Sequence, residues 1–387
     1  MTWKMRVGIN GLFLALGKMA GMETYLRALV RELPGLDPDV EYILFTERKN
    51  AGSFDHGGHA NIREVTCPVP TPPTRQAAWA SRMLYEYTAL PIQARREGID
   101  VLFSPAFIGP ARAAYASVIT IHDTQHEDLP KNFGAVDRAV FTRLLRRSVR
   151  SAAHIFTVSE YAKRRIETMY AVPPERITVT YHAADPIYFN RVSGAEIARV
   201  RQAYGLRAPY LLSVASLMPH KNLDTLVDAF ATLRRMTDQS VQLALVGLRS
   251  VATTPLEEKI RAAGLERDVV ITGYVPDADM PALYQGAAVF VMPSRYEGFG
   301  LPVLEAMASG VPVVTTTATA LPEVAGDAAL LVDPDDRDGF VAALRRVLSD
   351  TALCEWMIAR GTARAHLFSW QRAAEVTLAT LVRSVRQ

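Results

Sequence analysis

Short apolar runs alternate with segments of helical periodicity along almost the whole chain. Most of these runs are nearly continuous in apolar residues, which is typical of parallel strands covered on both faces. In the first half, the predicted strands are Met5–Asn10, Val40–Glu47, Asp100–Ala106, Ala116–Asp123, His154–Ser159 and Ile177–Ala183. In the second half, they are Tyr210–Ser216, Val241–Gly247, Val269–Val275, Ala287–Ser294 and Val311–Thr317. The alternation of strand and helix predicts an α/β fold with parallel sheets.

The division into domains follows from a change in pattern near the middle of the chain. The polar stretch Asp185–Arg207 has little strand character, and the series of strands starts again after it. A chain of 387 residues is also too long for one ordinary core. We therefore predict an N-terminal domain over residues 1–195 and a C-terminal domain over residues 196–369.

Composition and charge exclude several classes of protein. The net charge of +3 is too small to indicate binding to nucleic acid. The two cysteines, Cys67 and Cys354, form neither a disulfide framework nor a CxxC metal site, which favours the cytoplasm. No apolar stretch reaches the roughly 18 residues that a membrane helix needs. The sequence thus predicts a soluble cytoplasmic protein, at most peripheral to a membrane.

The segment Ala287–Val314 carries the sharpest chemical signal. A buried strand ends at Ser294, a loop with Glu297 and Gly300 follows, and a short helix begins at Pro302. Glycines allow close approach of a ligand, and the free N–H groups of a helix start attract phosphate. The segment therefore predicts a diphosphate site, with Glu305 in the first helical turn in reach of ribose hydroxyls and Glu297 near a sugar. The alternative is that both glutamates only favour a helix start.

This segment resembles that of the retaining GT-B glycosyltransferases of family 4, whose hallmark is two glutamates separated by seven residues. The resemblance covers nearly the whole chain in the correct order. The matching segments are MRVGINGLFL, VITIHD, TVSEYAKRRI, HKNLDTLVDAF, ITGYVPDADMPALYQGA and FSWQRAAEVTLATLVRS. The resemblance implies two Rossmann-like parallel-sheet domains facing each other across a cleft, the first on the acceptor side and the second binding the nucleotide sugar. It also implies that the helix at residues 370–387 packs back onto the first domain.

The resemblance assigns donor-binding roles to residues of the C-terminal domain. Lys221 would neutralise the leaving diphosphate, although a solvated surface lysine is the simpler interpretation of any single Lys. Val275 belongs to the segment that binds the base. Phe299, Gly300 and Leu301 lie where the loop meets the diphosphate.

The chain departs from the family at two positions near Lys221. Many members carry an arginine five residues before the lysine, where this chain has Ser216. A subgroup carries it directly before the lysine, where this chain has His220. We expect Lys221 to act with a protonated or a hydrogen-bonding His220, so that donor binding is weaker or depends on pH.

Two residues of the N-terminal domain are implied in the same way. The family has a histidine beside the reacting sugar, here His122, and a Gly-rich loop near the donor phosphates, here reduced to Gly21. The alternatives are a loop histidine bonded to backbone and a glycine at a helix entry. A metal cluster of His122 with His126, Glu127 and Asp128 is not favoured, because the chain has no HExxH motif.

Three Asp-x-Asp triplets raise the question of a divalent metal. They lie at Asp37/Asp39, Asp277/Asp279 and Asp333/Asp335. Each occurs in a turn that contains proline, and Asp277 or Asp279 is a natural N-cap for a helix over Met280–Gly286. We predict no metal and no cofactor, the nucleotide sugar being a substrate.

Five arginines decorate one predicted helix, at Arg138, Arg143, Arg146, Arg147 and Arg150. Apolar residues alternate with them, so the helix either packs its apolar side on the core or lies on an anionic membrane. The first interpretation is favoured, and peripheral membrane contact stays the alternative.

The sequence as a whole predicts a retaining, metal-independent hexosyltransferase. Its partners would be a nucleotide-diphosphate sugar and a glycan or lipid-linked acceptor, in surface polysaccharide synthesis. The Pro-x-Lys-Asn turn is similar to that of bacterial mannosyl- or rhamnosyltransferases of surface polysaccharide assembly, and of the possible donors GDP-mannose is favoured. The alternatives are a nucleotide-sugar 2-epimerase of the same fold and a donor-binding homologue without activity.

Overall fold

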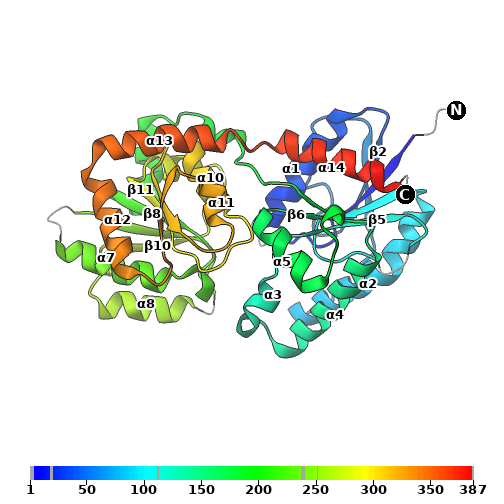
Figure 1. The fold of residues 1–387 in the computed structure, drawn as a ribbon, viewed down its shortest axis with the longest axis horizontal. Coiled ribbons are helices and arrows are strands. Elements are labelled where there is room, and N and C mark those ends of the chain that lie inside the picture. Colours follow the sequence, from blue (N-terminus) through cyan, green and yellow to red (C-terminus); the bar gives the residue numbers. More distant parts are fainter. Residues whose placement is uncertain (1–3, 18–20, 111–112, 237–239, 251, 386–387) are drawn as a thin grey trace. The chain divides into compact units, whose positions relative to one another are not determined.

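The computed structural model describes residues 4–17, 21–110, 113–236, 240–250 and 252–385. The chain forms two compact units. Unit 1 comprises Met1–His182 and Ser369–Gln387, and unit 2 comprises Ala183–Phe368. Figure 1 shows that each unit is a sheet covered by helices.

In the described part of unit 1, seven parallel strands form one sheet in the order β3-β2-β1-β4-β5-β6-β7. The strands are β1 (Arg6–Asn10), β2 (Glu41–Glu47), β3 (Ile62–Cys67), β4 (Val101–Ser104), β5 (Ala116–Ile121), β6 (His154–Thr157) and β7 (Ile177–Val179). The helices are α1 (Gly21–Leu36), α2 (Arg75–Arg96), α3 (Gln125–Asp128), α4 (Ala135–Ser151), α5 (Glu160–Tyr170) and α14 (Trp370–Val385). Short 3-10 turns occur at η1 (Pro130–Asn132) and η2 (Pro174–Arg176).

In the described part of unit 2, six parallel strands form a sheet in the order β10-β9-β8-β11-β12-β13. The strands are β8 (Tyr210–Val214), β9 (Gln242–Val246), β10 (Val269–Gly273), β11 (Val289–Met292), β12 (Val313–Thr316) and β13 (Ala329–Val332). The helices are α6 (Gly194–Ala203), α7 (Leu223–Met236), α8 (Thr253–Ala262), α9 (Met280–Gln285), α10 (Leu301–Ala308), α11 (Leu321–Ala325), α12 (Arg337–Ser349) and α13 (Thr351–Ala365), with 3-10 turns at η3 (Pro186–Phe189) and η4 (Pro219–Lys221).

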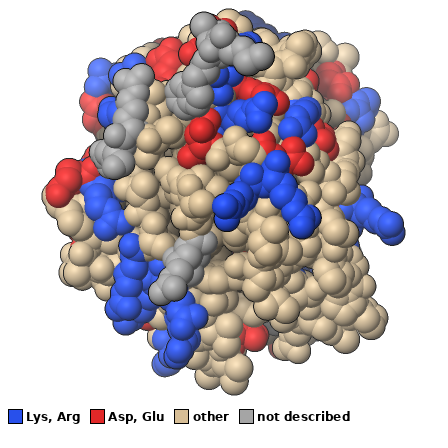
Figure 2. Space-filling model, turned by 90° about the vertical axis from the view of Figure 1, so that its right-hand side faces the viewer, with Lys and Arg blue, Asp and Glu red and all other residues tan. Residues whose placement is uncertain are grey.

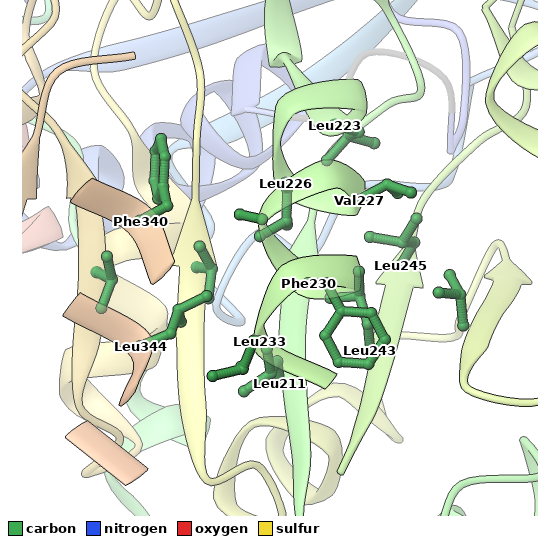
Figure 3. Close-up of a cluster of buried hydrophobic side chains, with 14 of the residues drawn as sticks. Leu211, Leu223, Leu226, Val227, Phe230, Leu233, Leu243, Leu245, Phe340 and Leu344 are labelled. Carbon is green, nitrogen blue, oxygen red and sulfur yellow. The ribbon is translucent and has the colours of Figure 1, made fainter. Parts of the chain in front are cut away.

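The core of unit 2 forms where the apolar stripe of α7 meets the sheet (Figure 3). The stripe that the helical spacing predicts, Leu223, Leu226, Val227 and Phe230, is buried. It packs against side chains of β8 and β9, and Phe340 and Leu344 of α12 join the same cluster. Burial of each such side chain stabilises the fold by about 1.5–3 kcal/mol, so this face of the sheet is rigid.

The units divide earlier in the chain than the predicted boundary between residues 195 and 196. The segment after His182 packs within unit 2, where the Tyr188 ring lies 5.5 Å from that of Tyr284. The amide of Val192 donates to Gln285 Oε1 at 2.9 Å. These contacts attach the polar stretch to unit 2, although its composition predicts that the domain boundary lies within it. At the other end, α14 groups with unit 1.

Both sheets are wholly parallel, so within each unit the carboxyl ends of the strands lie at one edge. In open α/β sheets, ligands bind outside that edge. The loops that follow β1, β5 and β7 in unit 1, and those that follow β8, β10 and β11 in unit 2, are therefore where the predicted site residues are to be sought.

Candidate functional site

The loop between β11 and α10 depends on a glycine that no other residue can replace without strain. Gly300 is the N-cap of α10 and has φ 111°, and a Cβ there would lie 2.6 Å from Leu321 Cδ2. The helix begins at Leu301, one residue before the predicted start, with Pro302 in its first positions. The first N–H groups of α10 thus follow directly on the Glu297–Gly300 loop, as a diphosphate site requires.

Glu305 does not lie in the first turn of this helix, as the sequence predicted. It is the fifth residue of α10 and is half-buried, and its carboxylate accepts a 2.8 Å hydrogen bond from the Tyr284 hydroxyl. Burial raises the pKa of Glu305 to about 7, and the nearby Asp277 and Asp185 add to the effect. The alternative that Glu305 only favours a helix start is therefore wrong, because a charge that does so lies in the first turn.

Lys221 and Glu297 form a close ion pair. Lys221 Nζ lies 2.7 and 2.8 Å from the two carboxylate oxygens of Glu297, and both side chains are largely buried. The turn that carries Lys221 is anchored by Asn222, which has φ 58° and donates to the carbonyls of Pro293 and Pro334 at 3.0 and 2.7 Å. Two residues that the sequence assigned to one site thus meet at the carboxyl ends of β8 and β11.

Neither Ser216 nor His220 supplies a second positive charge beside Lys221. Ser216 is exposed, and His220 is half-buried with its carbonyl accepting from the Arg295 amide at 2.8 Å. Burial and the charge of Lys221 lower the pKa of His220 to about 4. Of the two predicted roles, a protonated His220 is therefore not supported near neutral pH, whereas hydrogen bonding by the neutral ring is compatible with the structure.

The side chains of Phe299 and Val275 are both buried. Phe299 is buried with its ring 5.9 Å from that of Phe368, and Val275 is buried just after β10. Sequence reasoning missed Gly247, which directly follows β9 and has φ 151°. A Cβ there would overlap the Ala215 carbonyl. The close approach of the loops after β8 and β9 requires this glycine. Its signal was a lone Gly directly after a buried strand.

In unit 1, His122 follows β5 and Gly21 begins α1, with Ala20 outside the described residues. His122 is buried, and its Nε2 lies 2.9 Å from the carbonyl oxygen of Pro105. A carbonyl only accepts, so Nε2 carries the proton and Nδ1 keeps its lone pair. Burial lowers the pKa of His122 to about 4, so the ring is neutral near neutral pH and Nδ1 is a hydrogen-bond acceptor.

The residues of the disfavoured metal cluster are engaged elsewhere. His126 bonds the Tyr170 hydroxyl at 3.0 Å, Glu127 pairs with Arg138 and Arg146, and Asp128 pairs with Arg165. Across the part of the chain that the structure describes, no three His, Cys, Asp or Glu side chains are grouped to hold a metal.

The Asp-x-Asp triplets lie in turns. The first Asp of Asp37/Asp39 and of Asp333/Asp335 accepts the backbone N–H of the second, at 2.9 and 2.8 Å. The sequence predicted that Asp277 or Asp279 caps this helix. Asp279 does occupy the N-cap position of α9, but its side chain makes no capping hydrogen bond. Its carboxylate instead binds Arg199 and the Tyr204 hydroxyl, which draw it away from the helix end.

Helix α4 packs on unit 1 from Phe141 onward. Leu145, Ser148 and Val149 are buried, and the half-buried Phe141 ring meets the rings of Phe107 and His126, whereas Val136 is 76% and Val140 42% exposed. The favoured interpretation, an apolar side on the core, therefore holds from Phe141 to the end of the helix but not for its first turns. No helix among the described residues is long and apolar enough to span a membrane.

Comparison with known proteins gives a consistent result. The model of Glycosyl transferases group 1 matches residues 196–364, and that of Glycosyltransferase Family 4 matches residues 19–187. The O-antigen chain mannosyltransferase B of Escherichia coli is 37% identical over 306 residues, which are 79% of this chain and 76% of that protein.

Two solved structures share the fold over nearly the whole chain. WaaG, a glycosyltransferase involved in lipopolysaccharide biosynthesis, has a TM-score of 0.75 at 16% identity and covers 97% of this chain and 99% of its own. Anabaena Alr3699/HepE in complex with UDP and glucose has a TM-score of 0.75 at 20% identity and covers 98% and 100%. With the two parallel sheets, this similarity confirms the predicted GT-B fold class.

Proposed function

Because the chain belongs to the group 1 glycosyltransferases, we propose that it is a retaining enzyme that transfers mannose from GDP-mannose to a glycan or lipid-linked acceptor. The observation that carries the proposal is the Lys221–Glu297 ion pair beside the start of α10, with half-buried Glu305 farther along the same helix. The relative in O-antigen synthesis supports mannose as the sugar and surface polysaccharide as the product.

The donor diphosphate would replace Glu297 as the ion-pair partner of Lys221. The ammonium is paired with Glu297 in the structure, and a diphosphate carries more charge than one carboxylate. Donor binding would therefore exchange the partner of Lys221 and release Glu297 toward the sugar. The N–H groups at Leu301 and the following residues supply the remaining positive field.

The Glu305 carboxylate would accept hydrogen bonds from the ribose hydroxyls of the donor. Its carboxylate is already oriented by the Tyr284 hydroxyl, and burial strengthens each hydrogen bond that it accepts. Val275 and Phe299 would contribute backbone contacts, since both side chains are buried.

The transfer step needs no protein nucleophile. The bond from the anomeric carbon to the diphosphate oxygen breaks, the acceptor oxygen forms its bond on the same face, and the acceptor proton passes to the departing diphosphate. Lys221 and the α10 start stabilise the charge that develops on the diphosphate. His122 Nδ1 would accept a hydrogen bond from a hydroxyl of the reacting sugar.

The proposal is tested first with nucleotides and then with products. Thermal shifts with GDP, UDP, dTDP and ADP compare the bases, since a bound ligand stabilises by about 2.7 kcal/mol at 100 times its Kd. We expect GDP to give the largest shift and labelled GDP-mannose to yield an α-linked product, identified by NMR. An inverted product or a larger UDP shift would overturn the mechanism or the donor, respectively.

A donor-binding homologue without transfer activity is the second candidate. It is favoured by exposed Ser216 and neutral His220, which leave Lys221 as the sole cation of the predicted diphosphate set. This candidate would be supported if the protein binds GDP but shows neither mannose transfer nor slow hydrolysis of GDP-mannose. Conversion of a nucleotide sugar to its 2-epimer would instead identify an epimerase.

Peripheral membrane contact would use α4. Val136 and Val140 are exposed one turn apart, and Arg143, Arg147 and Arg150 are exposed on the same helix. Figure 2 shows a face of the molecule on which uncharged surface borders groups of Lys and Arg side chains. We expect flotation with vesicles that contain anionic lipid, and its loss in Val136→Asp/Val140→Asp. Equal flotation of this variant would exclude the contact.

A further inference from the structure

Four rings from distant parts of the chain converge at the carboxyl edge of unit 1. The His182 ring stacks on Tyr25 of α1 at 5.1 Å between centroids, and lies 5.5 Å from Trp370 of α14. His122 meets the Tyr25 ring edge-on at 5.2 Å and lies 5.7 Å from His182. All four side chains are at least 94% buried. Such a cluster has few alternative arrangements, because interiors are close-packed.

The orientation of His122 is not fixed by its hydrogen bond alone. The bond from Nε2 to the Pro105 carbonyl sets the tautomer, yet it leaves the ring free to turn about the line between the two groups. The edge contact with Tyr25, the neighbouring His182 ring and the Phe107 ring, 5.9 Å from His122 between centroids, restrict that freedom. The direction of the Nδ1 lone pair is thus set by rings that carry no charge themselves.

His182 lies against both residues that the sequence assigned to this edge. Besides its contact with His122, its ring atom Cε1 would be 3.9 Å from a Cβ added at Gly21, the first residue of α1. Tyr25 in turn is held by its hydroxyl, 3.2 Å from Thr180 Oγ1 beside β7. His182 therefore connects the start of α1, the end of β5 and the start of α14.

We propose that His182, held between Tyr25 and Trp370, is a positioning residue that fixes the ring plane of His122 and thereby the geometry of sugar transfer. This inference rests on the proposed function of His122. It gives the C-terminal helix a part in the reaction, because Trp370 closes the far side of the stack. The side chains proposed to bind the nucleotide, Lys221 and Glu305, lie in unit 2, and Gly21 would offer only backbone to the phosphates, so we expect nucleotide affinity to change little when His182 is substituted.

The test compares His182→Ala, His182→Phe and Trp370→Phe with a matched control. The control is His154→Ala, a half-buried histidine at the amino end of β6, bonded to Thr178 at 2.8 Å and with a pKa likewise lowered to about 4. We expect His182→Ala to lower kcat at least tenfold with the Kd for GDP unchanged. His182→Phe and Trp370→Phe each keep an aromatic ring in the stack, so both variants should retain most of the wild-type kcat.

Two results of these kinetic measurements would overturn the proposal. One is a wild-type kcat for His182→Ala measured below its melting temperature. The other is an equal loss of kcat in His154→Ala, which would show that any buried histidine of this sheet has the same effect.

A second measurement does not depend on activity. Histidine ring ¹⁵N NMR, with His122→Asn used for assignment, reports the tautomer and environment of His122. We expect one tautomer, protonated at Nε2, in the wild type, and a shifted or mixed signal in His182→Ala. If the wild type transfers no sugar, the proposed function fails while this spectrum still decides the positioning role. An unchanged His122 signal in His182→Ala would overturn that role.

Discussion

Glu305 is half-buried, and its carboxyl group has a pKa of about 7, raised from an ordinary value of 4.5. A carboxyl whose pKa is raised by folding contributes stability that is full below pH 4.5 and is lost as the pH rises through 7. The loss is roughly 3 kcal/mol above that pH, by the free energy of each pKa unit. A loss of stability on ionisation of a carboxyl group is expected mainly at functional sites, where the ionised form binds or reacts.

We expect Glu305→Gln to melt higher than the wild type at pH 8 and to match it near pH 4. The same variant should bind GDP less tightly by about 1–3 kcal/mol, since a hydroxyl of the ligand loses its charged acceptor. Wild-type binding should weaken as the pH falls through 7. Calorimetric titration and melting curves across pH measure both effects.

Glu86→Gln is the matched control for this prediction. Glu86 is buried, in α2 of unit 1, and burial raises its pKa to about 7 as well. Its substitution should change the pH dependence of stability in the same way but leave the Kd for GDP unaltered. A weaker Kd in Glu86→Gln would mean that the binding loss reflects general destabilisation, not a ribose contact.

The Lys221–Glu297 pair gives a second prediction at this scale. Glu297→Ala should lower kcat more than it raises the KM for the donor, because a contact with the sugar strengthens in the transition state. Lys221→Ala should affect both. Because each single variant leaves a partner without its ion pair, the double variant completes the cycle that isolates the coupling. If melting temperatures fall while kcat/KM is unchanged, the pair is structural only.

The sequence indicates which residues form the candidate site, but not how they pair or how burial changes their pKa values. The spacing of Glu297 and Glu305 and the Pro-His-Lys-Asn turn indicated which residues to examine. Neither indicates that Lys221 reaches Glu297, 76 positions away, or that Tyr284 donates to Glu305. Burial and pairing across the sheet create both properties, and they arise only in the folded chain.

At the scale of elements, the central strands were predictable and two edge strands were not. The buried strands β8 and β9 read as continuous apolar runs. β3 and β13 lie at the ends of their sheets, and most of their residues are not fully buried, so neither forms the continuous buried apolar run by which the central strands were found. An edge strand is covered by fewer neighbours, and its sequence is correspondingly less constrained.

The start of α10 gives a prediction for a single glycine. Gly300→Ala combines a left-handed backbone with a 2.6 Å contact to Leu321, so we expect a loss of about 1–3 kcal/mol in unfolding free energy. Gly194→Ala is the control, because Gly194 begins α6 with open space around it and should gain about 0.4–1 kcal/mol. Equal melting temperatures for the two variants would contradict the assigned strain.

At the scale of the whole molecule, the two-unit organisation follows from chain length and from the restart of the strand series. The position of the division did not follow, because it depends on which unit the η3 segment packs against. Tyr188 settles this by its contact with Tyr284. The return of α14 to unit 1 is likewise a packing event: Trp370, Ala374 and Leu381 of α14 are buried, and the helix lies against α1.

The last prediction concerns the charge of the donor and how the chain meets it. A diphosphate requires positive partners, and the enzymes that lack them recruit a divalent metal through paired carboxylates. Here the described Asp-x-Asp triplets are committed to turns or to arginines, whereas Lys221 and the start of α10 supply positive charge without a metal. We therefore expect the initial rate of mannose transfer to be unchanged after dialysis against EDTA, and added Mg²⁺ or Mn²⁺ to increase it less than twofold. Lys221→Ala should lose most of the rate under both conditions. Complete loss of wild-type activity in EDTA, restored by either metal, would show that a cation carries the charge that we assign to Lys221.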